Sequence, residues 1–317
     1  SIIRDVTVEN FDKNAITVLN NGSGNLSVEV TGSTVIGAGP TDATAQNGIS
    51  LTGVSATVTD NTVVNLSYTK DDANSGYIST TSISDSEFTG NTLRDEVPSE
   101  GAPTGIYLTG SDDVTFAGNT IEGTAFGIFP NSGASDTEIE SNTLRGQDTA
   151  ILLSGSDDES IRSNTFEDNT RHLRDYDAET NLQELVANNT FDTAAYAEGG
   201  QQFLYSSIDD AVNGDRLADG GASAGDTIIV TSGTGTYEES IEVSKPDLTI
   251  RGEGSPVIDG RIDIPVDGTT IEDLTVRDGD PSGSDEVEAI FVGNANGFDD
   301  TSENIVIRDV TIEDVHP

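Results

Sequence analysis

Apolar and polar residues alternate in short runs along most of this chain. The segments TGIYLTGSDDVTFAGNTIEG (104–123) and TAILLSGSDDESIRSNTFED (149–168) each hold two alternating stretches, separated by a turn rich in Gly, Ser and Asp. A period of two places apolar side chains on one face of a strand and polar side chains on the other. No part of about the first 190 residues keeps a helical spacing, so the pattern predicts an all-β fold.

The same pattern returns every 22 to 30 residues, and each copy ends on Asn, Thr and a large apolar residue. The Asn positions are Asn61, Asn91, Asn119, Asn142, Asn164 and Asn189. A period in this range with short β segments indicates a solenoid, in which each coil contacts only its neighbours. Leucine-rich repeats share the period, but they need a leucine-dominated consensus, which these coils lack.

We interpret these asparagines as structural. The turn before each Asn-Thr pair needs a residue that tolerates a positive φ, and we expect Asn itself to fill this role. Asn side chains stacked from coil to coil also donate and accept hydrogen bonds, which satisfies polar groups inside the stack.

The repeats resemble those of right-handed parallel β-helices, the pectin-lyase-like superfamily, over nearly the whole chain. The resemblance implies a solenoid of parallel strands and says almost nothing about function. We expect the apolar wall to end at TRHLRDYDAETN (170–181), where His172, Leu173 and Arg174 take the positions that the apolar segment 151–153 holds in the preceding coil. One more strand, LQELVANNTF (182–191), and a small-residue linker follow. We therefore predict a first β-helix over residues 1–195, open at its N-terminal end.

A second β-helix is predicted over residues 196–317, open at its C-terminal end. Its first element is a capping helix at about 204–213, because Leu204, Ile208 and Val212 share one face at helical spacing. Ser206 or Ser207 is the expected N-cap. The following stretch, 225–260, resembles the start of a β-helix domain in the same superfamily. A cap covers the apolar end and the unpaired strand edges of a first coil.

The charge of the chain limits the classes of function that it can have. With 57 acidic and 14 basic residues, the net charge is −43, which excludes a nucleic-acid binder. Molar salt shortens the Debye length to about 3 Å and removes the self-repulsion of such a surface. This composition resembles that of proteins from extremely halophilic archaea; the alternative is an acidic, calcium-loaded secreted protein. No run of about 18 apolar residues is present, so no membrane insertion is predicted for this segment.

Polysaccharide cleavage is the enzyme hypothesis that the superfamily resemblance implies. Pectate-lyase-like members use a calcium cluster with an Arg or Lys base, and polygalacturonase-like members use Gly-His-Gly and Arg-x-Lys motifs. Neither motif occurs here, and turn chemistry explains both GSDD segments (110–113 and 155–158). The basic cluster of Arg171, His172 and Arg174 is interpreted as a charged end to the apolar stack. No catalytic residue is predicted.

Sugar stacking is not expected to be strong either. The chain has no Trp, seven Tyr and ten Phe, and most of the Phe residues fall at inward coil positions. Few aromatic rings then remain to form an exposed platform for a sugar.

Calcium is the predicted ligand. DGDPSGSDE (278–286) resembles the opening of an EF-hand loop, with oxygens at positions 1, 3 and 5 and Gly at position 6. Position 12 is Ala289 instead of a bidentate Glu, so the motif departs from the full loop; a solvated acidic loop is the alternative. The predicted metal ligands are Asp278, Asp280, Ser282, Asp285 and Glu286.

Four N-glycosylation sequons occur, which bear on the protein only if it is secreted. Their acceptors are Asn21, Asn25, Asn65 and Asn188.

Two short segments far apart in the chain are nearly identical. Residues 3–9 (IRDVTVE) and 307–313 (IRDVTIE) agree at six of seven positions with an offset of 304, whereas 271–277 (IEDLTVR) matches 307–313 at three. The match indicates either the sequence pattern that every coil repeats or a true long period. We expect these coils to form a stacking interface. Its predicted residues are Ile2, Val6, Val8, Ile305, Ile307, Val310 and Ile312.

These observations predict an extracellular, cell-surface structural protein of a halophile. It would form a fibre, filament or coat through head-to-tail self-association or through tandem copies. The alternative is a polysaccharide lyase or hydrolase, or a viral fibre or tailspike domain that binds cell-surface glycan.

Overall fold

The computed structural model describes most of the chain and divides it into two compact units. The described residues are 1–22, 24–39, 44–66, 68, 76–95, 103–177, 179–199, 202–214, 221–277, 288–293 and 302–313. The first unit holds residues 1–179 and 183–190, and the second holds residues 180–182 and 191–317. The predicted all-β solenoid is confirmed, with two short helices in the described parts.

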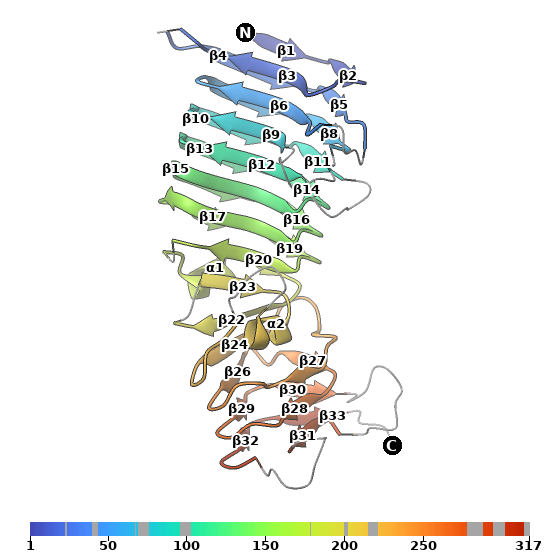
Figure 1. Cartoon of the computed structure of the whole chain (residues 1–317), viewed down its shortest axis with the longest axis vertical. Helices are drawn as coiled ribbons and strands as arrows, with labels where there is room; N and C mark the ends of the chain where they lie inside the picture. Colours follow the sequence, from blue (N-terminus) through green and yellow to red (C-terminus); the bar gives the residue numbers. More distant parts are fainter. Residues whose placement is uncertain are drawn as a thin grey trace. The chain divides into compact units, whose positions relative to one another are not determined.

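The first unit is built from three stacks of parallel strands (Figure 1). One stack runs through β1 (Ile2–Arg4), β4 (Ser27–Thr31), β7 (Ser55–Thr59), β10 (Ser84–Thr89), β13 (Asp112–Ala117), β15 (Phe126–Glu140) and β18 (Ser160–Arg162). A second runs through β3 (Asn14–Leu19), β6 (Asn47–Thr52), β9 (Gly76–Thr81), β12 (Thr104–Thr109), β15, β17 (Thr149–Asp157) and β20 (Arg171–Asp175).

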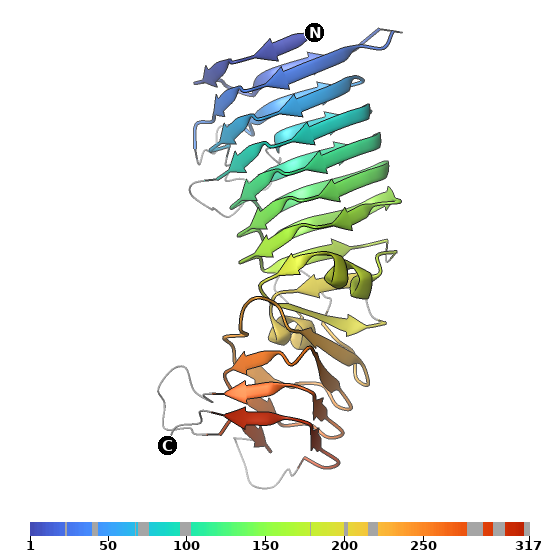
Figure 2. The ribbon, with the colours of Figure 1, turned by 180° about the vertical axis from the view of Figure 1, so that it is seen from behind.

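The third stack holds the strands that follow the Asn column, and Figure 2 views the stacks from behind. It consists of β2 (Thr7–Glu9), β5 (Thr34–Ile36), β8 (Thr62–Val64), β11 (Thr92–Arg94), β14 (Thr120–Glu122), β16 (Thr143–Arg145), β19 (Thr165–Glu167) and β21 (Thr190–Phe191). The middle residue of nearly every triplet is apolar and buried, which fills the interior between the stacks.

An isoleucine column runs down the interior of the second stack. It contains Ile16, Ile49, Ile78, Ile106, Ile128 and Ile151, each in register with the next. Leu173 then pairs in register with Ile151. The expected end of the apolar wall at His172 to Arg174 is therefore wrong, because His172 aligns with Ala150 and it is Leu173 that continues the column after Ile151. Both Arg171 and His172 are fully buried in this additional coil.

The expected strand over 182–191 is also wrong. Residues Leu182–Asn188 form helix α1, and only Thr190–Phe191 are extended, as β21. Leu182 and Leu185 are one helical turn apart and both buried, so a three-residue apolar spacing sets the local structure.

Positive φ angles lie one residue before the Asn column, not on it. Asp60, Gly90, Gly118, Ser141 and Ser163 have φ between 54° and 64°. This left-handed residue turns the chain between two strands, and Asn is then free to point inward. The expectation that Asn fills the positive-φ position is therefore wrong, whereas the predicted coil-to-coil hydrogen bonding is confirmed. Asn61 Nδ2 donates to Asn91 Oδ1 at 3.0 Å, and each following pair repeats this bond.

The second unit begins with short antiparallel and helical elements. These are β22 (Ala194–Glu198), β23 (Gln202–Tyr205) and α2 (Ile208–Asn213). The predicted capping helix at about 204–213 is present but shorter, because Leu204 lies on β23. The N-cap of α2 is Ser207, whose hydroxyl accepts from Asp210 N–H. Glu239 also accepts from Ser207 Oγ and from the N–H of Ile208, so the helix N-terminus is satisfied twice.

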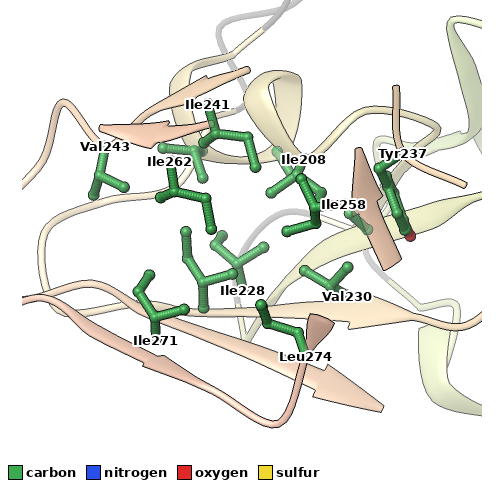
Figure 3. Close-up of a cluster of buried hydrophobic side chains, with 14 of the residues drawn as sticks. Ile208, Ile228, Val230, Tyr237, Ile241, Val243, Ile258, Ile262, Ile271 and Leu274 are labelled. Carbon is green, nitrogen blue, oxygen red and sulfur yellow. The ribbon is translucent and has the colours of Figure 1, made fainter. Parts of the chain in front are cut away.

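Three parallel stacks follow in the second unit. They are β24 (Thr227–Thr231), β26 (Thr249–Glu253), β29 (Thr270–Glu272) and β32 (Val306–Arg308); β25 (Ile241–Glu242), β28 (Ile262–Ile264) and β31 (Ile290–Val292); and β27 (Val257–Asp259), β30 (Thr275–Arg277) and β33 (Thr311–Glu313). Their inward side chains form one core with the buried face of α2. Figure 3 shows Ile208 of this helix next to Ile258, in one cluster with Ile228 and Ile271 of the strands.

Candidate stacking interface

The first coil of the first unit carries apolar side chains that its own neighbours leave exposed. Strand β1 pairs with β4 and strand β2 with β5, and no second partner of either strand occurs among the described residues. Ile2 is 64% and Val6 37% exposed, while Val8 is half-buried. The free edges leave backbone N–H and C=O groups without strand partners.

The last described coil of the second unit has the same character. Strand β32 pairs with β29 and β33 with β30. Ile307 is 43% and Ile312 54% exposed, whereas Ile305 and Val310 are half-buried against the core. All seven predicted stacking residues thus lie on these two coils, three on the first and four on the last.

Few large apolar side chains are exposed in the described structure. The exposed ones are Ile2, Val6, Leu19, Tyr176, Val292, Val306, Ile307 and Ile312. Apart from Tyr176 and Val292, they lie on β1 to β3 or on β32 and β33. Apolar exposure is therefore concentrated on the terminal coils, which is the usual mark of an interaction surface when residues are contiguous.

One ion pair joins the last coil to its neighbour. The guanidinium of Arg308 on β32 contacts the carboxylate of Glu272 on β29, and the two residues are in register. Glu272 is almost fully buried. Arg4 holds the corresponding position on β1, and within the described structure no acidic partner faces it.

The paired acids of the two GSDD segments belong to turns. Asp113 and Asp158 have φ of 54° and 61°, and they stack with Asp85 and Asp136, which also have positive φ. Desolvation, and then the nearby Asp112 and Asp158 carboxylates, raise the pKa of Asp136. These side chains are exposed, and their left-handed backbone is the reason for Asp at these positions.

The basic cluster is packed into the fold. Arg171 Nη1 donates to Thr149 Oγ1 at 3.0 Å, and the His172 ring packs edge-on against Phe166 at 5.6 Å between centroids. Arg174 lies over the Tyr176 ring at 4.3 Å. Because Arg171 and His172 are fully buried, a polymeric substrate would not reach them.

The structure brings together one group of side chains that the sequence reasoning missed. Tyr107 on β12 and Phe129 on β15 are in register and lie on the outward side, with ring centroids 5.2 Å apart. The Phe126 ring lies 5.8 Å from the Phe129 ring. Asn131 Nδ2 donates to the Tyr107 hydroxyl at 2.9 Å. The alternation of inward and outward residues could have predicted the outward position of Tyr107, because Tyr107 lies between the inward residues Ile106 and Leu108.

The predicted calcium ligands, Asp278 to Glu286, lie outside the described residues. Within the described part, no group of three or more His, Cys, Asp or Glu side chains is arranged to hold a metal ion. Among the sequons, Asn21, Asn25 and Asn188 are exposed, while Asn65 is half-buried with φ of 60°.

No helix in the described segments has the length and apolar character to cross a membrane.

Comparison with protein families places the chain. The model for a right handed beta helix region matches residues 14–207, which is more than half of the chain. Comparisons with curated proteins and with solved structures gave no match. The parallel stacks, the buried isoleucine column and this match agree, and the chain belongs to the right-handed β-helix family.

Proposed function

We propose that this chain is an extracellular structural protein of a halophile, which forms a surface fibre, filament or coat by end-to-end stacking of β-helix coils. The observation that carries the proposal is the concentration of exposed apolar side chains on the first and last coils. Ile2 and Val6 lie on the first, and Ile307 and Ile312 on the last. Each of these side chains lies on a coil whose strands pair on one side only among the described residues.

Stacking one coil on another would form a strand ladder and remove apolar surface from water at once. Burial of apolar area contributes about 25 cal/mol per Å², and a free parallel edge readily pairs with another chain. The net charge of −43 opposes contact between copies at low salt. Association is therefore favoured in molar salt, in keeping with the proposed halophilic source.

The test is self-association of the chain across salt concentration, followed by sedimentation and electron microscopy. We expect rod-like assemblies in molar KCl or NaCl and monomers near 0.1 M. Ile307→Asp should prevent assembly, because it places a charge on the apolar rim. Tyr176→Asp is the matched control, since Tyr176 is also 52% exposed but lies away from both terminal coils. A chain that stays monomeric in every salt would overturn the proposal.

Glycan binding is the second candidate, and the outward rings of Tyr107 and Phe129 favour it. Aromatic faces of this kind pack against the C–H groups of sugars. Binding of acidic and neutral polysaccharides in molar salt tests this function, with Tyr107→Ala and Phe129→Ala expected to weaken it. Release of shortened oligosaccharides would indicate a lyase or hydrolase instead, whereas unchanged affinity of both variants would count against the aromatic patch.

A further inference from the structure

The coil at residues 2–9 and the coil at residues 306–313 share more than their strands. In both, three extended residues are followed by an Asp with positive φ, at 54° for Asp5 and 52° for Asp309. The coil at 270–277 has this geometry as well, with φ of 60° at Asp273, so geometry alone does not single out the pair. Two outward residues do, because Arg4 and Glu9 recur as Arg308 and Glu313 at an offset of 304, whereas the coil at 270–277 has Glu272 and Arg277 there.

An independent sign lies at the position after the left-handed residue. In the first unit this position holds Ser33 and then the Asn column, whereas in the second unit it holds Leu274 and Val310. The first coil departs from its own unit, because Val6 is the residue there. At this inward position, the coil 2–9 is thus of the second unit's type.

The contacts on either side fit one continuous series. Below the first coil, Val6 N–H donates to Ser33 Oγ at 3.3 Å and Val6 O accepts from Thr34 N–H at 2.8 Å. Above the last coil, Leu274 O accepts from Thr311 N–H at 3.0 Å. Leu274 belongs to the core shown in Figure 3, and Val310 packs against it. If the two coils are equivalent, this inward position is occupied in three successive coils by Leu274, then by Val310 or Val6, and then by Ser33.

Charge agrees with this order. Arg308 reaches the nearly buried Glu272 of the coil above it, whereas Arg4 has no acidic partner among the described residues. A coil of the 270–277 type above residues 2–9 would supply that carboxylate.

We propose that residues 306–313 take the place of residues 2–9 in a following copy of this chain, so that successive copies share one coil and repeat every 304 residues. The partner at the junction is a second copy of the same sequence, continued in one polypeptide. Its Arg4 pairs with Glu272, its Val6 lies under Leu274, and its Thr7 N–H donates to Leu274 O. This proposal rests on the end-to-end stacking above and specifies its register.

The test compares two linked chains with equal coil geometry at the junction. In the shared-coil chain, residues 1–305 are followed by residues 2–317. In the shifted chain, residues 1–305 are followed by residues 29–317, which places Thr31 opposite Glu272 and Ser33 under Leu274, in keeping with the pairing of Ile2 with Glu29. Both are unfolded by heat in molar KCl, and their amide hydrogen exchange is measured.

We expect the shared-coil chain to melt at a higher temperature than the shifted chain. The Thr7 amide of its second copy should exchange about tenfold or more slower than that of its first copy. Arg4→Ala in the second copy should lower the melting temperature, whereas Arg4→Ala in the first copy should not. An equal or higher melting temperature for the shifted chain, or equal exchange of both Thr7 amides, overturns the proposal.

The outcome is separable from that of the proposed assembly. If single chains fail to associate in molar salt, end-to-end assembly of separate chains is wrong, and the shared coil is still decided by the two linked chains. If single chains associate but the shifted junction is as stable as the shared one, the register is wrong and the assembly stands.

Discussion

Asn91 and Asn119 are joined by a double hydrogen bond inside the solenoid. Asn119 Oδ1 accepts from Asn91 Nδ2 at 2.9 Å and from Asn91 N–H at 3.0 Å. Asn119 Nδ2 in turn donates to Asn142 Oδ1 and to Phe88 O, both at 2.9 Å. Every polar atom of the buried amide therefore has a partner, and the interior tolerates a column of polar side chains.

Asn119→Ala should destabilise the first unit by roughly 3 kcal/mol, because the Asn91 N–H and one proton of Asn91 Nδ2 lose their acceptor and Phe88 O loses the Asn119 donor. Urea unfolding in molar salt measures the loss. Thr120→Ala is the control, since this side chain points outward and its removal should cost about 0.5 kcal/mol or less. Equal costs for the two variants would show that the ladder adds nothing to stability.

Tyr237→Phe should destabilise the second unit by about 1 to 3 kcal/mol. The buried hydroxyl accepts from Ala194 N–H at 2.8 Å and lies 2.8 Å from Ala194 O and 3.0 Å from Thr231 O. Burial raises the pKa of this phenol well above its ordinary value, so it stays a neutral donor. Tyr176→Phe should cost about 0.5 kcal/mol or less, because Tyr176 is exposed. Thermal unfolding of both variants compares them.

Mild acid should stabilise the protein at low salt. Desolvation raises the pKa of Glu239 and of Asp136, so the folded state binds these protons more tightly than the unfolded chain does. The unfolding free energy then falls as pH rises from the ordinary carboxyl range, about 4, through the raised values. We expect a higher melting temperature at pH 5 than at pH 8. Molar salt should shrink only the part that comes from repulsion between Asp136 and the exposed Asp112 and Asp158 carboxylates.

Asp136→Asn isolates one part of this effect. Asn accepts the φ of 49° at this turn and removes the charge between Asp112 and Asp158, so the melting temperature at pH 8 and low salt should rise. Asp168→Asn is the matched control, because Asp168 has φ of 53° but pairs with Arg145 at 3.3 Å. A rise of the same size in the control would point to net charge alone.

Calcium should bind the acidic segment 278–286 with a dissociation constant of about 10⁻⁴ to 10⁻³ M, the range of extracellular modules. Isothermal titration calorimetry measures it, and chelation should lower the melting temperature. The double substitution of Asp278→Asn with Asp280→Asn should abolish binding. Asp112→Asn with Asp113→Asn, in an exposed turn, should leave it intact; binding lost in both would argue against a specific site.

The fold was predictable from the sequence because apolar alternation and the Asn column are repeated over many coils. The helix α1 was not, since its seven residues bury only Leu182 and Leu185 and then run directly into an Asn-Thr pair of the column. At Arg171 and His172, the offset from the preceding coil is 22 residues, the same as between Asn142 and Asn164, so Leu173 and not His172 aligns with Ile151. Tertiary packing decides both places.

The outward aromatic patch was missed for a different reason. Composition counts Phe129 with the inward rings, whereas its register on β15 places it on the outward side beside Tyr107. For the stacking residues, alternation in 2–9 and 306–313 predicts which side chains are apolar. It does not say which neighbour covers them, because each coil obeys the same rule.

The last rung of the Asn column has an unusual donor. Inner rungs direct one Nδ2 proton to the next Asn, but Asn189 Nδ2 donates to Ile161 O at 3.0 Å and to Leu185 O at 2.8 Å. Leu185 lies in α1, where the final carbonyls lack helical partners. The Asn column and helix α1 therefore end at the same place, because Asn189 Nδ2 donates to Leu185 O and not to a further Asn. The helix thus sets the number of coils over which the Asn column extends.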